Sequence, residues 1–179
     1  MSNKDGSNNQ SKWLIKIFII TFMLSLVFNS LSTKLIEELN IIWSVLTLTI
    51  VILTGIISDL IATAVTAASE APFHAKAADK KKGAKESVKL VRNADKVSNV
   101  CGDVVGDICG VLSGATGALI SVNISNALGM SDITIVTMLV TATVTAITVL
   151  GKGIGKHLGI TKANEIVTIL GKVISVFSK

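Results

Sequence analysis

Long runs of apolar residues, separated by shorter polar segments, set the pattern of the chain. Four runs are candidates for membrane-spanning helices: residues 13–28, 41–69, 100–122 and 133–150. A helix that crosses a bilayer needs about 20 mostly apolar residues, and tilt or snorkelling of flanking side chains tolerates some variation in that length. The pattern therefore predicts an all-α integral membrane protein with four transmembrane helices.

The polar segments between and beside these runs predict the remaining elements. Residues 1–11 are polar and are expected to be a disordered tail, and residues 12–40 are expected to form an anchor helix and an external loop. The loop 70–98 has a weak apolar face, which predicts short juxtamembrane helices that are divided near Gly83. In residues 161–178, apolar side chains recur at helical spacing opposite lysines. That spacing predicts an amphipathic belt helix along the membrane interface.

Composition agrees with the membrane interpretation. Half of the 179 residues are hydrophobic and only 16% are charged, whereas about 25% of the residues in a soluble domain are charged. The mean hydropathy is +0.67. Soluble enzymes and soluble binding modules are therefore poor descriptions of this chain.

Basic residues are distributed unevenly around the four predicted spans. All 17 except Lys34 lie in the N-terminal tail and first turn, in the loop 70–98, or after the fourth span. The positive-inside rule then places both termini and that loop in the cytoplasm, as in a multi-pass protein of the cell membrane. The net charge of +5 is explained by this topology and by attraction to anionic lipid at the cytoplasmic face, and no nucleic-acid partner is expected.

The first span is expected to remain as an uncleaved anchor. The residues that follow it, FNSLSTKLIEE, lack the small-x-small pattern of a cleavage site, although its basic start also fits the alternative of a signal peptide. No enzyme motif such as GxSxG or HExxH occurs, so neither an enzyme nor a bound cofactor is expected. The run GKGIGKHLG lacks a preceding strand and is interpreted as the flexible exit of the fourth span.

Carboxylates within the apolar runs are the residues that indicate chemistry. Asp59 follows the main apolar run of the second span, and Asp103 and Asp107 lie in the first half of the third. A charged group at bilayer depth is costly and rarely faces lipid. If these two spans are antiparallel neighbours, the aspartates approach one another and Ser69 lies near the mouth. Such oxygen-only ligands favour a hard cation, with Mg²⁺ first, unless the aspartates only cap or solvate helix ends.

Glycines in the third span form a separate pattern. Gly102, Gly106, Gly110 and Gly114 recur every four residues, so they trace a groove that winds slowly around the predicted helix. Small residues at this spacing allow close approach of a neighbouring membrane helix. The four glycines are therefore predicted to be helix-packing positions.

The order of several segments resembles a known family. AASEA closes the second span, GAKESVKLVRNADKVSN forms a basic loop, GDICGVLSGATGA lies in the third span, and GKGIGKHLGITKANEIVTILGKVISVFSK follows the fourth. Over residues 41–179 this order resembles the transmembrane domain of the CorB/CorC and cyclin-M family of magnesium and cobalt transport or efflux proteins. Residues 12–40 are extra to that domain, and the family's paired CBS-type regulatory domains have no counterpart in these 179 residues.

The resemblance implies a dimer that moves Mg²⁺ through a site of serine and asparagine side chains and backbone carbonyls. Ser69 matches the family's serine motif, and residues 106–110 match its polar segment, with Asp107 between glycines where asparagines are expected. Lys152 and Gly155 stand where the family has an acid and a proline.

We therefore expect a divalent-cation transporter or efflux component for Mg²⁺ or Co²⁺ that works as a homodimer, with a separate regulatory protein as a candidate partner. The alternative is a non-transporting membrane scaffold built on the same domain. An enzyme that acts within the membrane ranks third.

Overall fold

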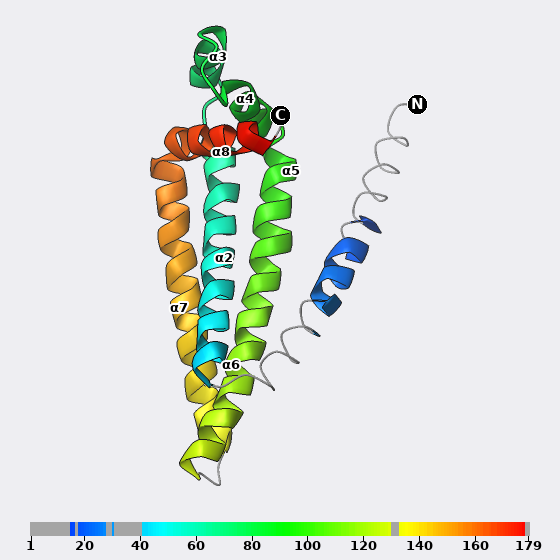
Figure 1. Ribbon diagram of the computed structural model, residues 1–179, viewed down its shortest axis with the longest axis vertical. Coiled ribbons are helices and arrows are strands. Elements are labelled where there is room, and N and C mark those ends of the chain that lie inside the picture. The colour runs from blue at the N-terminus through cyan, green and yellow to red at the C-terminus, as the bar shows by residue number, and fades with distance from the viewer. Residues whose placement is uncertain (1–14, 17, 28–29, 31–40, 130–132, 178–179) are drawn as a thin grey trace, which may run out of the picture.

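The computed structural model describes residues 15–16, 18–27, 30, 41–129 and 133–177, and within these ranges the regular structure is helical, without strands. Three long helical segments lie side by side (Figure 1). They are α2 (Ile41–Ala67), the continuous run of α5 (Ala94–Ser98), η1 (Asn99–Gly106) and α6 (Asp107–Leu128), and α7 (Ile133–Thr161). All three are long and apolar enough to cross a membrane, so the all-α class is confirmed and these helices coincide with three of the four predicted spans.

The first predicted span is only partly within the described residues. A helix of ten residues extends from Phe18 to Val27. Residues 13–14, 17 and 28, which belong to the same predicted span, lie outside the described residues, as do residues 1–11 and 31–40. The first span, the disordered tail and the external loop therefore stay predictions.

Three shorter helices gather at one end of the long helices (Figure 1). They are α3 (Ala71–Ala78), α4 (Ala84–Arg92) and α8 (Ala163–Phe177), and α8 lies across the end of the bundle. Pro72 fits the first turn of α3, where a missing backbone N–H has no consequence. Gly83 precedes α4 with a φ of +81°, a left-handed conformation that favours glycine. The predicted division of the loop near Gly83 is therefore confirmed, and it coincides with this backbone conformation.

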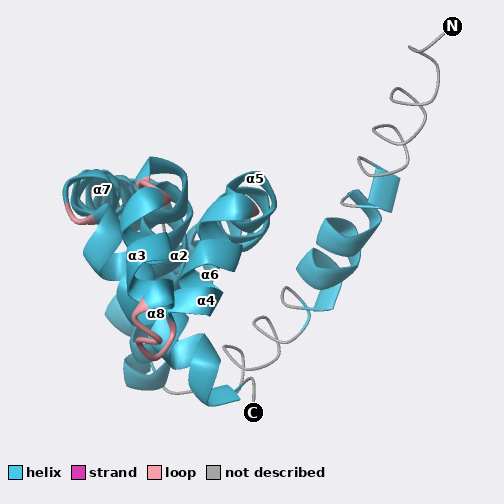
Figure 2. Cartoon of the chain, turned by 90° about the horizontal axis from the view of Figure 1, so that it is seen from above, coloured by secondary structure: helices cyan, strands magenta, loops and turns pink. Residues whose placement is uncertain are grey.

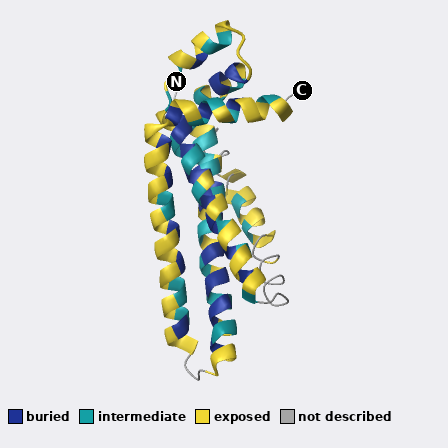
Figure 3. Cartoon of the chain, turned by 60° about the vertical axis from the view of Figure 1, so that its left-hand side comes forward, coloured by how far each residue is buried: buried dark blue, intermediate teal, exposed yellow. Residues whose placement is uncertain are grey.

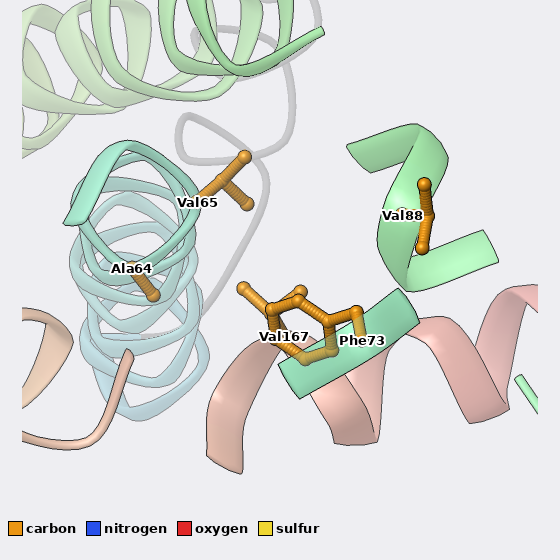
Figure 4. Packing of buried hydrophobic residues seen from close by; sticks show 5 residues of the cluster. All are labelled: Ala64, Val65, Phe73, Val88 and Val167. Atoms are coloured by element: carbon orange, nitrogen blue, oxygen red, sulfur yellow. The ribbon is translucent and has the colours of Figure 1, made fainter. Parts of the chain in front are cut away.

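An apolar core joins these short helices to the end of α2. Phe73, Val65 and Val167 are fully buried, and Ala64 and Val88 complete the cluster. Figure 4 shows Phe73 of α3 against Val167 of α8, with Val65 and Val88 on either side of them. The consecutive helices α2, α3 and α4 thus share one core with α8, which is distant in sequence, and this core fixes α8 against them.

The contact between α4 and α8 is unusually close. A Cβ placed at Gly171 would clash with Ser87 Oγ and with the carbonyl oxygen of Gly83. The buried Ser87 hydroxyl lies 3.0 Å from Gly83 O and 3.1 Å from Val167 O, both of which can accept its proton. We call this contact of Gly83, Ser87 and Gly171 the glycine clasp.

The long helices bury polar side chains beside aliphatic ones such as Leu48, Ile52 and Ile120, and they expose many large apolar residues on their outer faces. Buried polar side chains include Ser44, Ser58, Thr116 and Ser121, whereas the outer faces expose large aliphatic side chains. Figure 3 shows the exposed outer faces and the buried inner faces of these helices. Helices that pack within lipid have this arrangement, because apolar side chains gain little by leaving a hydrocarbon environment.

Candidate functional site

Charged and polar groups meet where α2, η1 and α7 pack together, and we call this group the polar cluster. It consists of the side chains of Ser58, Asp59, Asp107, Lys152 and Lys156 and the backbone carbonyls of Cys101 and Gly106. Viewed from above, α2 lies between α7 and α5, from which the helix continues through η1 into α6 (Figure 2), and α6 packs against both α2 and α7. Each of the three candidate spans therefore contributes to the cluster.

The polar cluster lies well inside the apolar helices. Asp59 precedes the end of α2 at Ala67 by eight residues, and Lys152 precedes the end of α7 at Thr161 by nine. With a rise of 1.5 Å per residue, both lie about 12–14 Å from the helix ends that meet α8. At such a depth an ionisable group needs a partner.

Asp59 is the buried anion of the cluster. Its side chain is 9% exposed, and its Oδ2 lies 3.5 Å from Lys152 Nζ and 3.9 Å from Lys156 Nζ. Removing a carboxylate from water is costly unless an opposite charge lies close to it. The two ammonium groups from α7 provide that charge, and the pairs join α7 to α2.

Lys152 is the cation at the centre of the cluster. Its side chain is 20% exposed, its Nζ lies 3.8 Å from Asp107 Oδ1, and it donates a hydrogen bond of 3.0 Å to Gly106 O. Together with Asp59, these groups surround the ammonium with two carboxylates and one carbonyl. Asp107 itself is 76% exposed.

The segment that faces Asp59 is a π-helix of eight residues, η1. Such helices are rare and occur often at functional sites. A Cβ at Gly106 would lie 3.1 Å from Asp59 Oδ1, and a Cβ at Gly102 would lie 3.3 Å from Ala62 Cβ. Ser58 donates a hydrogen bond of 2.6 Å to Cys101 O. Glycine in η1 thus lets the carboxylate and the backbone of a second helix approach each other.

The predicted packing glycines divide into two pairs. Gly102 and Gly106 pack against α2, as described above. A Cβ at Gly110 or at Gly114 would meet no atom within 4 Å among the described residues. The second pair therefore faces open space on the outer side of α6.

The predicted metal ligands are brought together only in part. Asp59 and Asp107 both approach Lys152, but Asp103 is exposed on η1. Ser69 lies beyond the end of α2, where its N–H donates a hydrogen bond of 3.1 Å to Asn164 Oδ1. Ser69 follows Asp59 by ten positions, and the eight of these within α2 alone span about 12 Å, so the structure does not bring Ser69 beside the aspartates.

Within the described part of the chain, no three or more histidine, cysteine, aspartate or glutamate side chains are arranged to hold a metal ion. Any divalent ion in the polar cluster would therefore need carbonyl oxygens or water in addition to the two carboxylates.

Lys152 and Lys156 are the residues of the polar cluster that the sequence interpretation missed. The run GKGIGKHLG was expected to be a flexible exit, but α7 continues through it to Thr161. The run does contain a pattern that indicates close helix packing, because Gly155 and Gly159 are four residues apart. A Cβ at Gly155 would lie 3.4 Å from Ile56 O, and a Cβ at Gly159 would lie 3.0 Å from Leu60 O. These glycines pack α7 tightly against α2.

A second charged group lies at the junction of α2 and α3, outside the long helices. Glu70 Oε1 accepts hydrogen bonds from Arg92 Nε at 2.6 Å and from His74 Nε2 at 2.7 Å. The hydrogen bond from Arg92, followed by that from His74, holds the pKa of the Glu70 carboxyl below its ordinary value. This exposed group links α3 to the end of α4.

Comparisons with known proteins leave the family of the chain open. No family model matches it, and neither a curated protein nor a solved structure shows significant similarity to it. The resemblance to the CorB/CorC and cyclin-M family therefore stays a prediction from the residues quoted above.

Proposed function

We propose that the chain transports a divalent cation across the cell membrane, with Mg²⁺ as the first candidate and Co²⁺ as the second. The polar cluster is the site through which the ion passes. The observation that carries this proposal is the environment of Lys152, a cation held by the carboxylates of Asp59 and Asp107 and the carbonyl of Gly106 inside membrane-length helices.

The chemistry of these groups suits a hard divalent ion. Mg²⁺ binds oxygen ligands at about 2.0–2.1 Å, keeps several of its waters, and is usually held by only one or two carboxylates. Asp59 and Asp107 provide two carboxylates, and Gly106 adds a backbone carbonyl. Ionisable residues inside a membrane span are rare, and an ion or substrate path is one of the functional sites that they mark. The π-helical backbone beside Asp59 adds a second feature that is common at functional sites.

A homodimer with cytoplasmic termini is part of the proposal. Asp103, Asp107, Gly110 and Gly114 are spaced so that they share one outer face of the η1–α6 helix, and a Cβ at either glycine would meet no atom within 4 Å among the described residues. Exposed carboxylates are costly against lipid. A second copy packed on this face would cover them, and the basic loop would contact anionic lipid on the cytoplasmic side.

Flux into liposomes tests the proposal. Purified protein is reconstituted into vesicles that contain a Mg²⁺-sensitive dye, and Mg²⁺ or Co²⁺ is added outside. We expect flux from the wild-type protein, loss of flux in Asp59→Asn, and unchanged flux in Asp79→Asn, whose carboxylate lies on the exposed connection after α3. Wild-type vesicles that are no more permeable to either ion than protein-free vesicles would contradict the proposal.

A non-transporting membrane scaffold is the second candidate, and the charge balance of the cluster favours it. Asp59 is already paired with Lys152 and Lys156, so the cluster is also consistent with a structural pin between α2 and α7. A scaffold would copurify with a stoichiometric partner and would show no flux in the same vesicles.

A further inference from the structure

Lys152 occupies the position that a transported cation needs, so the following inference rests on the proposed function. Its ammonium lies 3.5 Å from Asp59 Oδ2 and 3.8 Å from Asp107 Oδ1, and it donates a hydrogen bond to Gly106 O. These are the ligand types that a hard divalent ion prefers. We propose that Lys152 is the resident cation of the polar cluster, which a divalent ion must displace and which returns when that ion leaves.

Charge balance makes displacement necessary. Asp59 and Asp107 contribute two negative charges, and Lys152 and Lys156 contribute two positive charges, so the cluster is neutral as it stands. A divalent ion that joined both lysines would leave two uncompensated positive charges between apolar helices, which is costly. A divalent ion that replaces both ammonium groups restores neutrality.

The geometry lets the lysines move and holds the carboxylate in place. Lysine has a flexible four-carbon stem that can lie along apolar surface while its charged end reaches water. Lys156 is already 58% exposed and lies one turn nearer to the end of α7 than Lys152. Asp59, in contrast, is 9% exposed and packs against Gly106. The lysine side chains can therefore swing their ammonium groups toward the end of α7 that meets α8, whereas Asp59 keeps its position and binds the ion.

The exchange also sets a preference for ion charge. A monovalent ion that replaces Lys152 exchanges one positive charge for another, so it gains no attraction and still loses hydration water. A divalent ion is more strongly hydrated, but it can keep several of its waters, and its second charge adds attraction to the two carboxylates. When that ion leaves, Lys152 returns to Asp59, and the buried carboxylate is never left without a counter-charge. Removing Lys152 should therefore strengthen ion binding and slow repeated transport.

Amine reactivity in the wild-type protein tests the displacement directly. Detergent-solubilised protein is treated briefly with a water-soluble acylating reagent, and the modification of each lysine is measured by mass spectrometry. We expect modification of Lys152 to rise several-fold when Mg²⁺ is added and to stay constant with K⁺ at equal ionic strength. Lys89, exposed on α4, is the internal control and should not respond.

Two variants test the consequence for binding and transport. Lys152→Met should bind Mg²⁺ more tightly by about tenfold, and its steady flux should fall, whereas Lys89→Met should match the wild type in both assays. If Lys152→Met does not fold, the wild-type reactivity decides. Wild-type flux with unchanged Lys152 reactivity would overturn the displacement and leave the transport proposal standing. A wild-type protein that neither binds nor transports Mg²⁺ or Co²⁺ would overturn both.

Discussion

Gly171→Ala adds one methyl group at the glycine clasp between α8 and α4. The added carbon would clash with Ser87 Oγ and Gly83 O and would lie 3.0 Å from Ser87 N. Two of these three atoms belong to backbone, and Ser87 is 1% exposed, so little can move locally. The two helices must therefore separate to accept the methyl group.

Three effects set the size of the change. Overpacking of a close contact costs about 1–3 kcal/mol. Displacing the Ser87 hydroxyl from its carbonyl acceptors, which lie 3.0 and 3.1 Å away, costs about 1 kcal/mol. Alanine offsets part of this, because it is a better helix former than glycine by about 1 kcal/mol. We expect a net loss of about 1–3 kcal/mol in the free energy of unfolding.

Thermal denaturation in detergent micelles measures this loss. In a chain of this size, 1 kcal/mol corresponds to a change of about 2–4 °C in Tm, so Gly171→Ala should lower Tm by about 2–12 °C. Hydrogen exchange should also show faster exchange of the α4 amides, because the contact that covers them has opened. Both measurements use the same purified protein.

Gly153→Ala is the matched control, because a Cβ at Gly153 in α7 meets no atom within 4 Å among the described residues. Its Tm should equal or exceed that of the wild type, since alanine is the better helix former. If Gly171→Ala is as stable as Gly153→Ala and its α4 amides exchange at the wild-type rate, the glycine clasp does not hold α8 to α4.

The remaining predictions concern the η1 contact, the shared core and the junction of α2 and α3. Gly106→Val should reduce the yield of folded protein in size-exclusion chromatography far more than Gly110→Val, because only Gly106 faces Asp59; equal yields would contradict this contact. Phe73→Ala empties a fully buried position and should cost about 3–5 kcal/mol, seen as a lower Tm. Glu70 should stabilise the fold above its ordinary pKa of 4.5, because its carboxyl titrates at a lower pH when folded. This contribution should disappear as pH falls through the folded pKa, so the Tm of Glu70→Gln should converge with that of the wild type in acid.

Sequence alone predicts the elements of this fold where a local pattern determines them. The apolar run that begins at Ile41 becomes α2, and the break near Gly83 follows from a φ of +81° that glycine adopts readily. The end of α7 at Thr161 was not predicted, because glycine and lysine usually indicate the end of a span. Here the glycines pack against α2 and the helix continues, so tertiary contact overrides local preference.

The partners of Asp59 could not be predicted from its own segment. The cost of a carboxylate at bilayer depth singles out Asp59, Asp103 and Asp107, but finding the counter-charge of Asp59 requires the rotation of α7. Two glycines indicate which face of α7 is turned toward α2, because Gly155 and Gly159 pack against that helix. Each residue turns a helix by about 100°, so Lys152 and Lys156, which also lie four residues apart, share one flank of that contact. Both ammonium groups reach Asp59 Oδ2 from this flank. In this chain the lysine pair beside the glycines of α7 thus serves as the counter-charge of a carboxylate on the neighbouring helix, in addition to its place in the uneven distribution of basic residues.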